Sequence, residues 1–161
     1  MNEQEQQINT FLVDVFNDVL RLEEASIVTS RHPNLSVSEM HVLEAVQKHS
    51  EAPGTMRQLA LRLGVTASSL TIAVKTLEQK GYLVRQKNDR DKRRVSVHLT
   101  GPALEALQSH AAFHEQLIRQ VSRTLTAPEL EALCQALGRL HRFFTTMEGP
   151  VHTDGPDREV F

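Results

Sequence analysis

The sequence predicts a mainly α-helical protein that carries one small β-hairpin. Apolar residues recur at three- and four-residue spacing through most of the chain, which is typical of amphipathic helices. Two short stretches between residues 82 and 99 have the composition of strands, and they flank a charged turn. The length of 161 residues and the apolar share of 40% suit one domain with helical extensions.

Residues 4–30 are predicted to form one long amphipathic helix. Pro33 ends it, because proline disfavours helix in the residue before it. A second helix begins at Ser36, which forms a capping box with Glu39 three positions later. Residues 51–54 then form a turn.

The central segment predicts two short helices joined by a tight turn. The first covers residues 55–63, and Gly64 lies in the turn. Thr66 caps the second helix, which runs to Lys80 and ends at Gly81 as its C-cap. Two helices with a short glycine-containing turn match a helix-turn-helix.

A hairpin follows the second of these helices. Residues 82–87 and 95–99 form its strands, and residues 88–94 form a charged tip. A helix-turn-helix followed by a two-stranded hairpin is a winged helix.

Two further helices complete the chain. One runs from about residue 103 to 124 with Pro102 in its first turn, and Thr126 caps another that extends to about residue 147. Residues 148–161 are expected to be a disordered acidic tail.

The charge distribution favours a nucleic-acid partner. The formal net charge is −2, but residues 55–100 hold ten basic side chains against three acidic ones. The remaining residues hold eight basic against seventeen acidic side chains. A basic module between acidic arms is the pattern expected of a domain that meets phosphate on one face.

The winged helix predicts how double-stranded DNA is read. Small polar side chains at the start of the second helix can reach base edges in the major groove, and a basic hairpin tip suits the minor groove. The expected DNA-binding residues are Ala67, Ser68, Ser69, Thr71, Ile72, Lys75, Arg90, Lys92, Arg93 and Arg94.

These motifs resemble the MarR family of winged-helix transcription regulators. The matching residues are Leu59, Ala60 and Val65, then residues 77–85 (LEQKGYLVR) and the wing sequence at residues 91–100 (DKRRVSVHLT). The resemblance implies that Asp91 braces the wing arginines. Two departures are Lys92, where arginine is usual, and residues 100–102 (TGP), which replace a Thr-x-x-Gly pattern.

The resemblance implies a homodimer on a pseudo-palindromic operator. Residues 1–35 and 101–147 would be dimerisation helices, and residues 36–100 the DNA-binding domain. The sequence supports this independently, because the last helix carries an apolar stripe that a small winged domain cannot cover: Leu130, Leu133, Leu137, Leu140, Phe143 and Phe144.

One interpretation of the effector is an acyl chain. The N-terminal sequences at residues 8–9, 16–20, 23–24 and 35–41 resemble the FabT subgroup, repressors of fatty-acid biosynthesis genes that respond to long-chain acyl groups on acyl carrier protein. No cofactor is needed for this response. The expected acyl-binding residues are Val15, Val19, Met40, His41, Leu107 and Phe113, with Arg21, Arg31 and Arg62 as a basic docking patch for the carrier.

The alternative is a zinc-responsive repressor of metal-uptake genes. His110 and His114 are four residues apart, which places both imidazoles on one helix face as a zinc site requires. Glu24 and His41 complete the expected set, and a zinc-sensing subgroup of the family places ligands in corresponding elements.

Other classes of protein are disfavoured. The sequence has no glycine-rich phosphate loop, serine elbow or HExxH, so an enzyme is not expected. The lone Cys134 excludes an internal disulfide and an all-cysteine metal site. No apolar run approaches the roughly 20 residues that span a bilayer, and residues 1–10 do not resemble a signal peptide, so a cytoplasmic location is expected.

Overall fold

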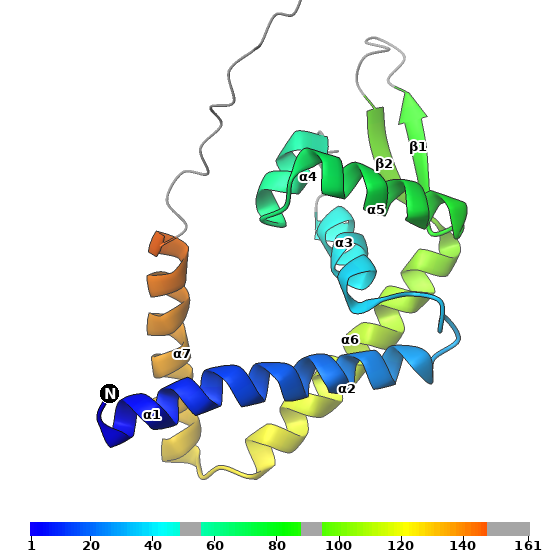
Figure 1. The fold of residues 1–161 in the computed structure, drawn as a ribbon. Coiled ribbons are helices and arrows are strands. Elements are labelled where there is room, and N and C mark those ends of the chain that lie inside the picture. The colour runs from blue at the N-terminus through cyan, green and yellow to red at the C-terminus, as the bar shows by residue number, and fades with distance from the viewer. Residues whose placement is uncertain (49–55, 88–94, 148–161) are drawn as a thin grey trace, which may run out of the picture. The chain divides into compact units, whose positions relative to one another are not determined.

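The computed structural model describes residues 1–48, 56–87 and 95–147. Across these ranges the chain is helical except for one two-stranded antiparallel hairpin (Figure 1), which confirms the predicted fold class. The chain forms two compact units, Met1–Glu115 and Gln116–Phe161. The first unit includes the N-terminal helices and residues 101–115 of a C-terminal helix, so this division does not test the predicted domain limits. Which helices form the dimer stays a prediction.

The N-terminal helix contains an irregular turn. It consists of α1 (Glu3–Thr10), a π-helical segment η1 (Phe11–Val15) and α2 (Phe16–Val28). The prediction of one regular helix over residues 4–30 is therefore wrong at residues 11–15. A π-turn holds an extra residue, which rotates the following side chains by roughly 100° relative to a regular helix. The apolar positions before and after η1 are offset by this rotation.

Three helices form the centre of the first unit: α3 (Val37–Lys48), α4 (Met56–Arg62) and α5 (Ala67–Gln79). The predicted capping box at the start of α3 is confirmed. The Ser36 amide donates to Glu39 Oε2 at 2.8 Å, and the Glu39 amide donates to Ser36 Oγ at 3.2 Å. Helix α3 packs against α2, α4, α5 and the hairpin, so it is the central element of this unit.

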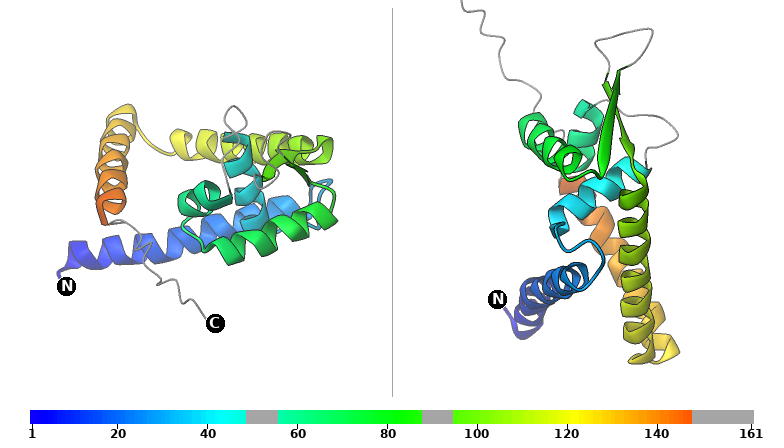
Figure 2. Two further views of the ribbon diagram at one scale, coloured as in Figure 1. Left: turned by 90° about the horizontal axis from the view of Figure 1, so that it is seen from above. Right: turned by 90° about the vertical axis from the view of Figure 1, so that its right-hand side faces the viewer.

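The hairpin consists of β1 (Leu83–Lys87) and β2 (Val95–Leu99), and Figure 2 shows its two strands side by side. The register places Leu83 opposite Leu99. The first strand begins one residue later than predicted. Tyr82 closes the end of α5 instead, because its amide donates to the Leu77 carbonyl at 2.9 Å. Gly81 has a φ of 82°, the left-handed conformation expected of the predicted C-cap.

Polar contacts attach the end of α5 to the segment before α3. Lys80 Nζ donates to the Asn34 carbonyl at 2.6 Å and to the two Glu39 carboxylate oxygens at 2.7 and 2.8 Å. The Tyr82 hydroxyl donates to Asn34 Oδ1 at 2.7 Å and lies 3.1 Å from His32 Nδ1. The first unit also has a continuous apolar core, in which Leu43, Leu70, Leu77, Leu83 and Val74 are fully buried.

The C-terminal helices are α6 (Gly101–Arg123) and α7 (Ala127–Met147). At the start of α7 the Thr126 amide and hydroxyl donate to Glu129 Oε2 at 2.8 and 2.7 Å, which is the glutamate half of a capping box around the predicted Thr126 cap. These hydrogen bonds lower the pKa of Glu129. Among the described residues, no helix is both long and apolar enough to cross a membrane.

Three predicted segments lie outside the described residues. They are the turn at residues 51–54, the wing tip at residues 88–94 and the tail at residues 148–161.

Candidate functional site

The first half of α5 presents small side chains to solvent. Thr66 caps the helix by accepting from the Ser69 amide at 3.1 Å, as predicted. Leu70, Val74 and Leu77 are buried in the core and fix the orientation of the helix. The opposite face carries the six predicted DNA-binding residues of this helix, all exposed: Ala67, Ser68, Ser69, Thr71, Ile72 and Lys75.

Hydrogen bonding within α5 restricts what these side chains can read. Thr71 Oγ1 donates its proton to the Ala67 carbonyl at 2.7 Å, so the hydroxyl is left with lone pairs to accept. It can therefore meet an adenine or cytosine amino group, or place its methyl against thymine. Ile72 is 68% exposed and offers an apolar surface to a thymine methyl.

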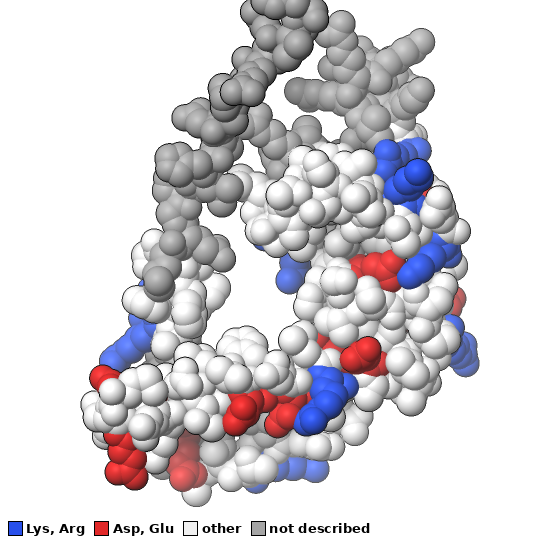
Figure 3. Space-filling view, in the orientation of Figure 1, with Lys and Arg blue, Asp and Glu red and all other residues white. Residues whose placement is uncertain are grey.

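The surface around α5 is largely uncharged on the face shown in Figure 3, whereas basic side chains gather towards the hairpin. Within the hairpin, Arg85 Nε forms an ion pair with Glu78 Oε2 at 2.8 Å, which links β1 to α5. The predicted wing residues Arg90, Lys92, Arg93 and Arg94 and their brace Asp91 lie outside the described residues.

A cluster of imidazoles and carboxylates lies in the first unit between α2, α3 and α6. His114 Nε2 is 3.1 Å from Glu23 Oε1 and 3.0 Å from His110 Nε2. His41 Nε2 is 3.9 Å from Glu23 Oε2, and His110 Nε2 is 3.7 Å from Glu44 Oε1. Three histidines predicted from the sequence are thus brought together with two carboxylates. Two overlapping groups of three, Glu23–His41–His110 and Glu44–His110–His114, have ligand atoms close enough to share a metal ion.

The acidic member of the predicted metal set needs correction. Glu24 is exposed, whereas its neighbour Glu23 is buried and faces His41 and His114. Successive residues on a helix point about 100° apart, so only one of two adjacent glutamates can face α3 and α6. Glu44 is a further carboxylate that sequence reasoning missed, although it lies three residues after His41 on the same helix.

His110 is the most buried titratable side chain of this cluster, with 3% of its surface exposed. Burial lowers its pKa, and the neighbouring His114 imidazole lowers it further, whereas the carboxylates of Glu44 and Glu23 oppose the shift. The imidazole is therefore neutral at pH 7, the form that binds a metal ion. Its Nδ1 has no hydrogen-bond partner among the described residues.

The six predicted acyl-binding residues differ widely in burial. Met40 and Leu107 belong to the close-packed core, with 2% and 4% of their surface exposed. Val15 is exposed at the end of η1, while Val19, His41 and Phe113 are half-buried. The π-turn and the core packing explain this difference, since neither is visible in the spacing of apolar residues.

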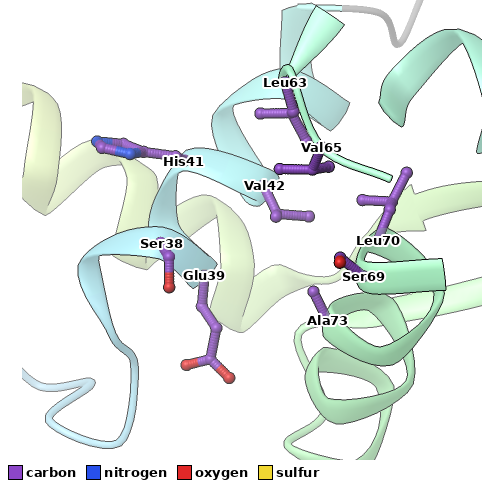
Figure 4. A pocket seen from close by; sticks show the side chains of 9 residues that line it. All are labelled: Ser38, Glu39, His41, Val42, Leu63, Val65, Ser69, Leu70 and Ala73. Carbon is purple, nitrogen blue, oxygen red and sulfur yellow. The ribbon is translucent and has the colours of Figure 1, made fainter. Parts of the chain in front are cut away.

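A separate pocket of about 310 Å³ opens between α3, the turn after α4, and α5 (Figure 4). Its apolar walls are formed by Val42, Leu63, Val65, Leu70 and Ala73. Ser38, Glu39, His41 and Ser69 lie around it, and His41 points away from the apolar walls. Among the residues that line it, His41 and Val42 had been considered for effector binding from the sequence, and Ser69 for DNA binding.

A helix-turn-helix with an exposed second helix and a hairpin wing defines a winged-helix DNA-binding protein. A sequence model described as the MarR family matches residues 34–94. The structure is similar to FabT of Streptococcus pneumoniae, solved in complex with DNA. The TM-score is 0.80, and the two sequences are 30% identical, covering 89% of this chain and 99% of FabT.

Two curated relatives agree with this class. YkoM of Bacillus subtilis, described as an uncharacterized HTH-type transcriptional regulator, is 29% identical over 133 residues, covering 82% of this chain and 85% of YkoM. The transcriptional regulator AdcR of Streptococcus pneumoniae is 27% identical over 158 residues, covering 94% of this chain and 99% of AdcR. The chain belongs to the MarR family of DNA-binding transcription regulators, and it is not an enzyme. The predicted similarity to FabT is confirmed.

Proposed function

We propose that this regulator represses fatty-acid biosynthesis genes and that a long acyl chain on acyl carrier protein increases its affinity for the operator. The similarity to FabT over nearly the whole of both chains carries this proposal. It is supported by the sequence of α2 and α3, where the resemblance to the FabT subgroup is concentrated. An effector acts only if it binds the DNA-competent state better than the other state.

The proposed DNA complex is a homodimer on a pseudo-palindromic operator. One α5 helix enters the major groove of each half-site, and the basic wing reaches the adjacent minor groove. MarR-family proteins are dimers, and the exposed apolar residues Leu137, Phe143 and Phe144 offer a surface for a second copy.

An operator titration tests the effector. Promoter fragments of fatty-acid biosynthesis genes are titrated with the protein alone, with long-chain acyl carrier protein and with the unacylated carrier as control. We expect only the acylated carrier to lower the operator Kd. Equal affinity with all three would contradict the acyl response.

The mode of DNA binding is tested by two substitutions. Arg93→Ala is expected to weaken binding to every sequence and to reduce its salt dependence, because the wing meets phosphates. Thr71→Ala is expected to change which half-site is preferred. Equal effects of both changes on every operator would argue against this mode.

The carboxylate–imidazole cluster supports a second candidate, a zinc-responsive repressor of metal-uptake genes. The proposed ligand set is Glu23, His41, His110 and His114, which would supply one carboxylate and three imidazoles for a tetrahedral ion. It combines residues of two overlapping groups whose ligand atoms lie close together, Glu23–His41–His110 and Glu44–His110–His114. Because these residues come from α2, α3 and α6, a bound ion would join the N-terminal helix to the centre of the first unit.

Metal analysis of protein purified without a histidine tag tests this candidate. A zinc regulator would hold about one zinc ion per chain, and a chelator would weaken operator binding. His114→Ala is expected to lose the metal, whereas the exposed His141→Ala is the matched control. Metal-free protein that binds operator equally with and without zinc would rule out the zinc response.

A further inference from the structure

The pocket beside α5 includes residues of the DNA-reading helix in its wall. Leu70 and Ala73 form one wall, and Ser69 at the rim is also a predicted DNA-binding residue. Val42 forms the opposite wall from α3, the central element of the unit. A molecule in this pocket therefore touches α3 and α5 at once and influences the position of the recognition helix (Figure 4).

The charges around the pocket select against an anion. The nine residues that line it include no lysine or arginine. Its one carboxylate, Glu39, points away from the apolar walls and accepts from Lys80 Nζ at 2.7 and 2.8 Å. A free carboxylate entering here would lose hydration, and Lys80 beside the rim is already paired with Glu39, so burying the anion is costly. A neutral ester or thioester avoids that cost.

The size and walls of the pocket favour a hydrocarbon chain. A volume of about 310 Å³ is near the lower end of small-molecule sites, so the pocket holds part of a long chain. Its five apolar wall residues supply dispersion contacts, and each buried methylene contributes about 0.8 kcal/mol, a fourfold gain in affinity. Ser38 and Ser69 offer hydroxyls to a carbonyl at the rim.

We infer that this pocket between α3 and α5 binds the end of an acyl chain whose head is a neutral thioester, and that it does not accept a free fatty acid. The inference rests on the proposed acyl response and gives it a location other than the predicted surface around Val15 and Val19. Occupancy fixes the spacing of α3 and α5, so the ligand acts through the recognition helix.

Direct binding of soluble probes tests the ligand class. The intact protein is titrated by calorimetry with hexanoyl, octanoyl and decanoyl thioesters of N-acetylcysteamine and with octanoate. We expect the octanoyl thioester to bind at least tenfold more tightly than octanoate, and affinity to rise about fourfold per methylene until the pocket is full. Equal binding of octanoate, or no binding of any thioester, would overturn the inference.

Two filling variants test the location. Ala73→Leu places a larger side chain in the pocket from α5, and Val42→Ile adds a methyl group from α3. Both should weaken thioester binding, by at least tenfold for Ala73→Leu. Ala111→Leu, at an exposed position of α6, is the matched control, and Val19→Phe tests the predicted surface on α2. Circular dichroism melts establish whether each variant folds. If Ala73→Leu does not fold, the binding measured with Val42→Ile decides the test.

The operator titration separates the pocket from the proposed function. If Ala73→Leu loses thioester binding but fatty-acid operators never respond to the acylated carrier, the pocket stands and the proposed function fails. If the acylated carrier tightens operator binding equally in the original chain and in folded filling variants, the function stands and the pocket is overturned. If Val19→Phe loses the response to the acylated carrier and Ala73→Leu retains it, the assignment of the acyl chain to this pocket is also overturned.

Discussion

The two compact units differ in how they bury apolar surface. In the first unit, sixteen hydrophobic residues from Ile27 to Leu107 form one buried core. In the second unit, none of the described residues is buried, and Leu137, Phe143 and Phe144 are 47%, 54% and 45% exposed. An isolated amphipathic helix of this length is marginal in water. The first unit can therefore be stabilised by its own core, whereas the second needs a partner surface, which a second copy of the chain would supply in the proposed homodimer.

The largest expected effect comes from charging the exposed stripe of the second unit. Leu137→Glu should produce monomers and weaken operator binding by about a hundredfold or more, because an unpaired charge in an apolar interface costs several kcal/mol. Light scattering after gel filtration and an operator titration measure the two effects. Gln135→Glu, which adds the same charge to a polar position of α7, is the control. A monomeric variant that still binds operator tightly would contradict the inference that operator binding requires a dimer formed through the second unit.

A smaller effect distinguishes burial within one chain from burial that depends on association with a second chain. Leu43→Ala should lower the free energy of unfolding by about 2–5 kcal/mol, because it leaves a cavity in a core that is closed within one chain. Leu137→Ala should instead make the melting temperature more dependent on protein concentration, since its burial depends on association. Denaturant and thermal melts at several concentrations measure both. A loss of stability that depends on protein concentration in both variants would show that the first unit also depends on the partner.

The smallest effect concerns histidines in the two environments. His110 is buried among His41, His114, Glu23 and Glu44, and its pKa is lowered, mainly by burial. Below about pH 6.5 the unfolded chain therefore binds a proton that the folded chain resists, so the free energy of unfolding falls as the pH falls. One such proton changes it by at most about 1.4 kcal/mol per pH unit.

Denaturant melts between pH 7 and 5 with a chelator present measure this dependence. His110→Gln should reduce the slope, whereas His141→Gln in the exposed helix α7 should leave it unchanged. An unchanged slope in His110→Gln would mean that another group carries the dependence.

The sequence by itself determined the features that depend on neighbouring residues. The capping box of Ser36 and Glu39, the Thr66 cap and the left-handed Gly81 were predicted because each is a contact or conformation within a few residues. The exposed face of α5 followed from the helical period, since the buried positions Leu70 and Val74 define the opposite side.

Only the tertiary structure decided which distant residues meet. Glu23 rather than Glu24 faces the histidines because α2 has one orientation against α3 and α6, and two adjacent glutamates look alike in the sequence. The π-turn at η1 shifts the helical register without a glycine or proline to mark it. The pocket between Val42 and Ala73 exists because side chains from α3, α5 and the turn between α4 and α5 leave space between them. Such a space depends on packing in three dimensions, which hydrophobic spacing along one chain does not record.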